Sequence, residues 1–140
     1  MATTVPVSVV TPERELVRAD AEMLIVRGAD GDLGILPHHI PLVTPIKPSI
    51  LEIRTPSGRE RYAVTGGFLE VRGDQVTVLA RTAERPEEID LARAEAARQR
   101  AEERLRDRAA DLDIVRAELA LQRALVRLQL AQEAGRTAAV

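Results

Sequence analysis

The seven residues Thr82-Ala83-Glu84-Arg85-Pro86-Glu87-Glu88 separate two different kinds of sequence. Every proline of the chain lies at or before Pro86, and neither glycine nor proline occurs from Glu87 to Ala134. Glycine and proline are the residue types that most strongly interrupt regular structure, so their absence predicts helices after residue 86. Proline suits the first position of a helix, and carboxylates in the first turn face the positive end of the helix dipole. We therefore expect two units, residues 1–85 and residues 86–140.

The first unit has the pattern of short strands joined by turns. Val5, Val7 and Val9 alternate with their neighbours at the two-residue period of a strand. Two further pairs of apolar segments flank loops that contain glycine: 51–54 with 61–64, and 68–71 with 75–79. Short strands at regular spacing predict an antiparallel β-sandwich or barrel.

The composition argues against several functional classes. The net charge of −2 lacks the basic excess of a nucleic-acid-binding domain. There is no cysteine, and a metal site would need further ligands converging on His38 and His39, which extended chain directs to opposite faces. Neither a nucleophile-elbow serine nor a Walker A loop is present, so we expect no enzyme activity of these kinds. No apolar run approaches the roughly 18 residues of a membrane span, so we expect no direct membrane insertion.

The second unit has the pattern of two packed helices. On the first, Leu91, Ala94, Ala101 and Leu105 share a face whose small alanines permit close approach. The second is predicted to begin near residues 111–113, where an aspartate can cap it. It carries two roughly opposite apolar stripes: Ile114, Ala117, Leu121, Leu125 and Leu128, and Leu112, Val115, Leu119, Val126 and Leu130. One stripe suffices for a hairpin, so the other requires the sandwich or a different protein.

Arginine is also ordered along both helices. Two rows share the spacing i, i+7, i+11: Arg93, Arg100 and Arg104 on the first helix, and Arg116, Arg123 and Arg127 on the second. A charge row is usually a solvated face. A solvated face and a binding surface therefore remain open for these rows.

Three motifs resemble the epsilon subunit of bacterial F-type ATP synthase, in the order found in that family: GILPHHIPL at 34–42, GGFLEV at 66–71 and RAELAL at 116–121. The resemblance covers nearly the whole chain. It implies an α+β fold, an N-terminal antiparallel β-sandwich followed by a C-terminal two-helix antiparallel hairpin. His38 departs from the family pattern, in which glycine or another small residue commonly stands at this position.

The resemblance implies a non-catalytic subunit of the rotor. The sandwich would bind the gamma subunit and the c-ring, and so couple F1 to the ring in proton-driven ATP synthesis. The helices would inhibit ATP hydrolysis when extended along gamma, and would be permissive when folded against the sandwich. Arg116, Arg123 and Arg127 would then contact the alpha and beta catalytic subunits. The location implied is the cytoplasmic face of the bacterial cell membrane, as a peripheral subunit.

The resemblance also implies a regulatory ATP site, with no prosthetic group. Some family members bind ATP through a motif that reads Ile89-Asp90-Leu91-Ala92-Arg93-Ala94 here. Asp90, Arg93 and Ala94 are neighbours on one helix face, and an arginine can hold phosphate oxygens in a forked geometry. The resemblance adds Glu84, Arg100, Arg123 and Arg127 to the site.

Two alternatives stay open at this point. Asp90 and Arg93 could form an ordinary helix salt bridge instead of holding a ligand. The chain as a whole could be a rotor coupler with inhibitory helices, or primarily an ATP-sensing module.

Overall fold

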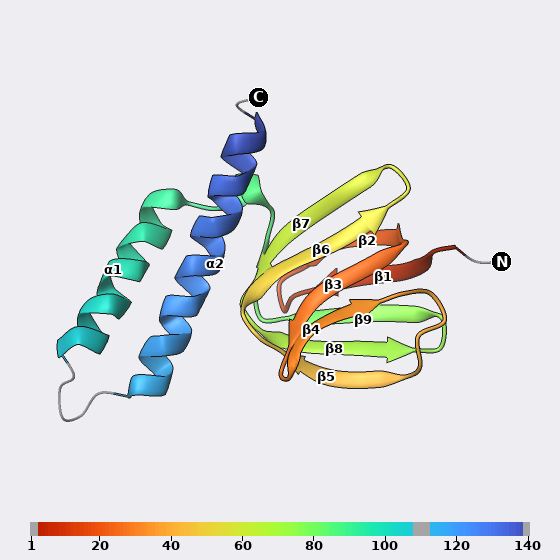
Figure 1. Cartoon of the computed structure of the whole chain (residues 1–140), viewed down its shortest axis with the longest axis horizontal. Helices are drawn as coiled ribbons and strands as arrows, with labels where there is room; N and C mark the ends of the chain where they lie inside the picture. Colours follow the sequence, from red (N-terminus) through yellow and green to blue (C-terminus); the bar gives the residue numbers. More distant parts are fainter. Residues whose placement is uncertain (1–2, 108–112, 139–140) are drawn as a thin grey trace.

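The structure, a computed structural model, describes residues 3–107 and 113–138 (Figure 1). Strands come first, and helices follow. The strands are β1 (Val5–Val10), β2 (Glu15–Ala21), β3 (Met23–Gly28), β4 (Gly31–Ile35), β5 (Leu42–Ile46), β6 (Ser49–Thr55), β7 (Gly58–Val64), β8 (Gly67–Arg72), β9 (Gln75–Ala80) and β10 (Ala83–Glu84). The helices are the short 3-10 helix η1 (Pro86–Glu88), α1 (Leu91–Asp107) and α2 (Ile114–Ala138). The predicted α+β class, a sandwich followed by two helices, is confirmed.

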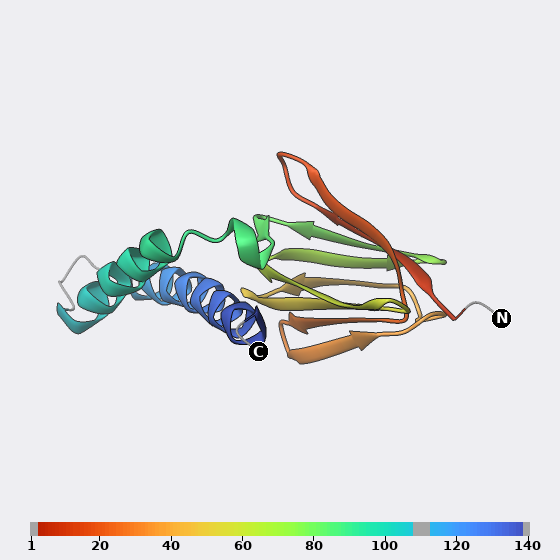
Figure 2. The ribbon, with the colours of Figure 1, turned by 90° about the horizontal axis from the view of Figure 1, so that it is seen from above.

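The strands wrap around one core, and the two helices lie beside one end of them (Figures 1 and 2). Hydrogen-bonded neighbours follow the order β10-β7-β6-β3-β5-β8-β9-β1-β2, with β4 paired to β3. The pairs are antiparallel except for β1 with β9, where Val7 lies opposite Val76 in a parallel register. The pairing between the first and ninth strands therefore joins the β1–β2 hairpin to the rest of the sheet.

Aliphatic side chains fill the core, as a chain with one Phe, one Tyr and no Trp requires. The buried residues alternate along the strands, for example Val76 and Val78 on β9. The largest fully buried side chains are Leu24, Ile35, Leu51, Ile53, Leu69 and Leu130. Leu130 belongs to α2, so the second helix also buries apolar surface.

Gly67 and His38 are two of the six described residues of this unit with positive φ. Gly67 begins β8 with φ +135° between β5 and β9, and a Cβ there would lie 2.0 Å from the carbonyl oxygen of Leu79. Only glycine allows this approach. His38 has φ 67°, so it takes the conformation that the glycine of the family pattern favours.

The helix-start signature at Pro86 marks η1 and not the long helix. The backbone N–H of Arg85 donates to Glu88 Oε1 at 3.0 Å, but Ile89 then returns to an extended conformation. Helix α1 starts afterwards, with Asp90 Oδ1 accepting from the backbone N–H of Arg93 at 3.0 Å. The side chain of Asp90 thus caps α1, because it satisfies a backbone donor that has no partner within the helix.

Helix α2 has the same kind of cap. Asp113 Oδ1 accepts from the backbone N–H of Arg116 at 3.0 Å. The alternative cap, Asp111, lies outside the described residues, as does Leu112 of the second apolar stripe.

The two helices meet along small residues. Ala94 and Ala101 of α1 and Ala117 and Ala124 of α2 are buried, and we call them the alanine seam. This confirms the expected close approach, but Leu91, expected on the same face, is exposed because it lies at the first position of α1.

The second apolar stripe of α2 only partly finds a surface on the sandwich. The helix contacts β6 and β7, and Leu130 is buried. Towards its start Val115 and Leu119 remain exposed, as do Ile114 and Leu125 of the first stripe. The sandwich therefore covers the C-terminal half of this stripe.

Ion pairs hold α2 to the sandwich at its C-terminal half. Arg61 of β7 donates through Nη1 to Glu133 of α2, and through Nε to Glu52 Oε1 at 3.1 Å. Glu52 also accepts from Arg54 Nε at 2.7 Å, and its side chain is only 7% exposed. A buried carboxylate of the sandwich therefore orients the arginine that reaches the helix.

Candidate functional site

A polar cleft of about 590 Å³ lies where the sandwich, α1 and α2 come together. The sandwich contributes the turn after β1 and the segment 81–84, α1 contributes its first three turns, and α2 contributes one arginine. The residues that line it are Thr11, Glu13, Arg14, Arg81, Thr82, Ala83, Glu84, Glu88, Asp90, Arg93, Ala94, Ala97, Arg100 and Arg127. The cleft therefore depends on both helices being folded against the sandwich.

The wall formed by α1 combines charge with small side chains. Arg93 and Arg100 stand on the exposed side of α1, whereas Ala94 is buried and Ala97 is half-buried. Alanines leave space beside the arginines for a ligand. The Asp90 carboxylate caps α1 through the backbone of Arg93, so it is not held by the guanidinium of Arg93. The alternative left open by the sequence, a side-chain salt bridge between Asp90 and Arg93, is not found in the described part of the chain.

The opposite wall joins α2 to the end of the sandwich. Arg127 Nε donates to Glu84 Oε1 at 2.6 Å, and Arg127 Nη2 lies 3.4 Å from Thr82 Oγ1. Thr82 Oγ1 also shares a hydrogen bond of 2.6 Å with Thr65 Oγ1. Residues far apart in the sequence are thus already positioned around the cleft by protein contacts.

A second ion pair of the cleft lies on the side of η1. Arg14 Nη2 donates to Glu88 Oε2 at 2.5 Å. The backbone N–H of Arg85 and then the Arg14 guanidinium lower the pKa of the Glu88 carboxyl. Sequence reasoning missed Arg14 and Glu88 as cleft residues, because Arg14 lies in the link between β1 and β2, which carries no motif, and Glu88 was read only as part of a helix start.

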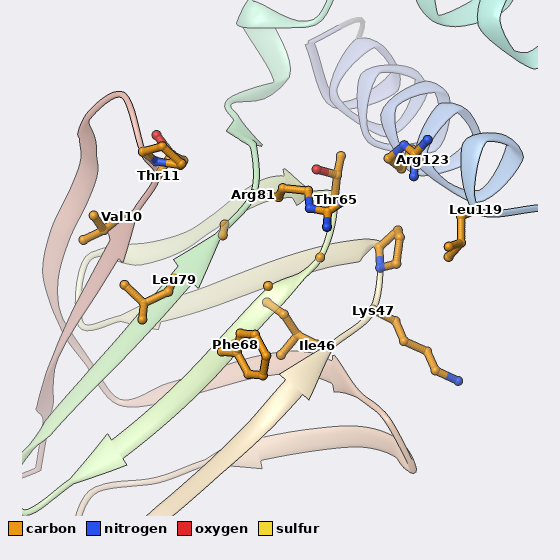
Figure 3. Close-up of a pocket in the computed structure, with 15 residues that line it drawn as sticks. Val10, Thr11, Ile46, Lys47, Thr65, Phe68, Leu79, Arg81, Leu119 and Arg123 are labelled. Atoms are coloured by element: carbon orange, nitrogen blue, oxygen red, sulfur yellow. The ribbon is translucent and has the colours of Figure 1, made fainter. Parts of the chain in front are cut away.

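Two predicted ATP-site residues do not line this cleft. Ile89 is half-buried in the extended link between η1 and α1. Arg123 faces a neighbouring groove of about 700 Å³ between α2 and the sandwich (Figure 3). The other predicted residues, Glu84, Asp90, Arg93, Ala94, Arg100 and Arg127, are brought together.

The neighbouring groove has an apolar floor and a basic rim (Figure 3). Ile46, Phe68 and Leu79 form much of the floor, and Leu119 of α2 lies at one side. Its charged residues are Lys47, Arg81 and Arg123. Thr11 and Arg81 line both the groove and the cleft, so the two hollows adjoin.

The arginine row of α2 is divided by its surroundings. Arg116 is exposed, whereas Arg123 and Arg127 are half-buried against the sandwich. A simple solvated face therefore describes Arg116 but not the other two.

Two family models match consecutive parts of the chain. Residues 4–86 match the β-sandwich domain of the ATP synthase delta/epsilon chain, and residues 87–132 match its long alpha-helix domain. In the described part of the chain, no helix is both long and apolar enough to span a membrane.

Curated relatives agree with these models. The chain is 57% identical over 100 residues to the ATP synthase epsilon chain of Brevibacillus brevis, covering 71% of this chain and 76% of that one. It is 56% identical over 102 residues to the ATP synthase epsilon chain of Bacillus subtilis, covering 73% and 77%.

A solved structure shares the fold. A chain of the Euglena gracilis mitochondrial ATP synthase, from a structure of OSCP, F1 and the c-ring, aligns with a TM-score of 0.77 at 21% identity, covering 94% of this chain and 81% of that one. Together with the two domain matches and the identity to curated relatives, the chain belongs to the epsilon chains of bacterial F-type ATP synthase, which are non-catalytic subunits of the complex.

Proposed function

We propose that this chain is the rotor subunit that couples F1 to the c-ring, and that its helices inhibit ATP hydrolysis when they leave the sandwich. Its partners would be the gamma subunit, the c-ring and, for the extended helices, the alpha and beta catalytic subunits. The kinship with epsilon chains and the shared fold with a chain of an F1/c-ring complex support this role. The subunit would work as a peripheral protein at the cytoplasmic face of the bacterial cell membrane, in proton-driven ATP synthesis.

We further propose that ATP binds in the cleft and favours the compact arrangement. The observation that carries this is the meeting of Asp90, Arg93 and Arg100 of the α1 region with Glu84 of the sandwich and Arg127 of α2. Arginine guanidiniums bind phosphate oxygens in a forked geometry, and a carboxylate can accept from a ribose hydroxyl or an adenine amine. ATP is therefore a ligand whose charge matches the cleft, and the proposal involves no metal or prosthetic group.

A ligand held by both helices and the sandwich binds the compact state better than the extended state, and so shifts the population towards it. At a concentration one hundred times its Kd, such a ligand stabilises the state that binds it by about 2.7 kcal/mol. A tenfold change in population requires about 1.4 kcal/mol. One bound ATP at that concentration therefore shifts the population more than tenfold towards the compact state, and this shift is the proposed means of releasing inhibition.

Calorimetric titration of the full chain with ATP tests this proposal. We expect saturable binding, strong weakening by Arg93→Ala, and no weakening by Arg104→Ala, which removes an exposed arginine of the same helix outside the cleft. Paired fluorophores on α1 and the sandwich should report a shorter mean distance when ATP is added. If ATP does not bind saturably up to millimolar concentration, or if the distance does not change, only the coupling role remains.

We also propose that residues 1–85 form a unit that folds without the helices. The buried core of the sandwich supports this, since every member of that cluster precedes residue 85. The fragment 1–85 should unfold cooperatively and bind gamma. A fragment that is unfolded would show that the helices are needed for the core.

A further inference from the structure

Four arginines gather where α2 faces the end of the sandwich: Arg81, Arg116, Arg123 and Arg127. Arg127 is paired with Glu84. Neither Arg81 nor Arg123 forms an ion pair within the described part of the chain. This corner of the molecule therefore carries positive charge that the protein itself does not neutralise.

The surroundings of Arg123 destabilise its positive charge. Burial lowers the pKa of Arg123 most, and the charges of Arg127, Arg81 and Arg116 lower this pKa further because like charges repel. A half-buried guanidinium loses part of its hydration without gaining a carboxylate in return. An anionic ligand with more than one negative charge would relieve both effects.

Arg81 occupies the position from which such a ligand can be reached. It follows β9, and its backbone N–H donates to the carbonyl of Gly66 at 2.8 Å, so its Cα is fixed by the sandwich. Its exposed side chain lines the cleft together with Arg93, Arg100 and Arg127, and lines the groove together with Arg123 (Figure 3). Arg81 therefore lies at the boundary between the cleft and the groove, whereas Asp90 lines the cleft alone.

On the basis of the proposed ATP site, we propose that Arg81 is the residue of the sandwich that binds the terminal phosphates of the nucleotide. The phosphates run from Arg93 and Arg100 towards the boundary of cleft and groove, where Arg81 and Arg123 converge on the γ-phosphate. This placement gives Arg123 a role although it lies outside the cleft. It also means that the nucleotide ties the helices to the sandwich, and not only to each other.

Nucleotides of different length separate this proposal from a general electrostatic effect. The unmodified full chain, Arg81→Gln, Arg81→Lys and Arg72→Gln are each titrated with ATP, ADP and AMP. Arg72 is the matched control, because its side chain is 86% exposed at the end of β8 and lines neither hollow. Thermal melting checks that each variant remains folded.

We expect Arg81→Gln to weaken ATP binding about tenfold or more, the loss typical of one hydrogen bond to a charged group. The loss should be smaller for ADP and absent for AMP. Arg81→Lys should retain part of the affinity, since it keeps the charge but not the fork. Arg72→Gln should bind all three nucleotides as the unmodified chain does.

Two results would overturn the assignment while leaving the ATP site itself intact. One is ATP binding by Arg81→Gln with unchanged affinity. The other is an equal loss for ATP, ADP and AMP, which would place Arg81 away from the terminal phosphate. Absence of saturable ATP binding by the unmodified chain would instead overturn the proposed ATP site, and the role of Arg81 with it.

Discussion

Replacing Gly67 by alanine should be among the most damaging single changes in the sandwich. Gly67 begins β8 and pairs with Ala80 of β9 on one side and Ile46 of β5 on the other. An added Cβ would lie 2.0 Å from the carbonyl oxygen of Leu79 and 2.9 Å from the Cα of Ala80. Both neighbours are backbone atoms, so the clash is removed only if the strands separate.

Two contributions set the size of the effect. The φ of +135° belongs to a region used almost only by glycine, and holding alanine there costs about 1–3 kcal/mol. Moving β9 away weakens ladder hydrogen bonds, each of which contributes about 1 kcal/mol. We therefore expect Gly67→Ala to lower the free energy of unfolding by about 4 kcal/mol, a large part of the 5–15 kcal/mol that is usual for a folded domain.

Gly73→Ala is the matched control. Gly73 lies in the β8–β9 turn with φ +60°, and no atom lies within 4 Å of an added Cβ. Alanine can adopt this left-handed conformation at a cost of about 1–2 kcal/mol. Urea unfolding of both variants, followed by circular dichroism, gives the midpoint and the slope m for each.

The reasoning is refuted if Gly67→Ala is no less stable than Gly73→Ala. A difference caused by the close approach of β9 must appear as a lower midpoint. A change in m alone would instead indicate a change in the unfolded state or a loss of two-state behaviour.

Four further predictions concern charges and the helix contacts. Burial raises the pKa of Glu52, but hydrogen bonds from Arg54 and Arg61 lower it more, so the pKa lies below its ordinary value of 4.5. Ionised Glu52 therefore stabilises the fold above that value, and this contribution is lost as the pH falls through the lower folded pKa. Glu52→Gln should remove about 1–3 kcal/mol at pH 7 and should flatten the loss of stability below pH 4.5, as measured by urea unfolding across pH. Glu133→Gln should weaken the pair with Arg61 by less than about 1 kcal/mol, since both side chains are about one-third exposed, and should speed amide exchange in the last turns of α2 only. Ala101→Leu should overfill the alanine seam at a cost of about 1–3 kcal/mol and lengthen the α1–α2 distance, while the melting of the sandwich stays constant. Arg116→Ala should raise ATP hydrolysis by the assembled complex. It should leave the affinity of this chain for ATP unchanged, because Arg116 is exposed outside the cleft. Unchanged hydrolysis with the subunit incorporated would exclude Arg116 from the inhibitory contact.

Local sequence patterns predicted the hairpins, whose strands and turns depend on residues close together in the sequence. The β6–β7 and β8–β9 hairpins follow from apolar segments around turns with glycine. Strand β5 was not expected because Pro45 interrupts it, and β2 was missed because only Leu16 and Ala21 of it are buried. The parallel pairing of β1 with β9 is a tertiary contact that no local pattern encodes.

The residues of the candidate site also fall into those that the sequence could predict and those that it could not. Asp90 and Arg93 could be predicted because both belong to a short motif, at the start of one helix, that the family resemblance points to. Arg14, Arg81 and Glu88 could not, because they enter the cleft from separate segments that only the folded chain brings together. The capping role of Asp90 was also missed, since the proline signature drew the helix start to residue 86.

The pairing of β1 with β9 also sets an order of events during synthesis. Val7 cannot pair until Val76 has been synthesised. The length-dependent part of the loop-closure free energy for this separation is about 4 kcal/mol. At roughly 5–20 residues per second, about 70 residues take about 4–14 s to follow β1 from the ribosome. During that time β1 has only β2 as a partner, and an isolated two-stranded hairpin is at best marginally stable in water. The nascent chain therefore presents an unpaired apolar edge for seconds, and the β1–β2 hairpin can join the rest of the sheet only once β9 has emerged from the ribosome.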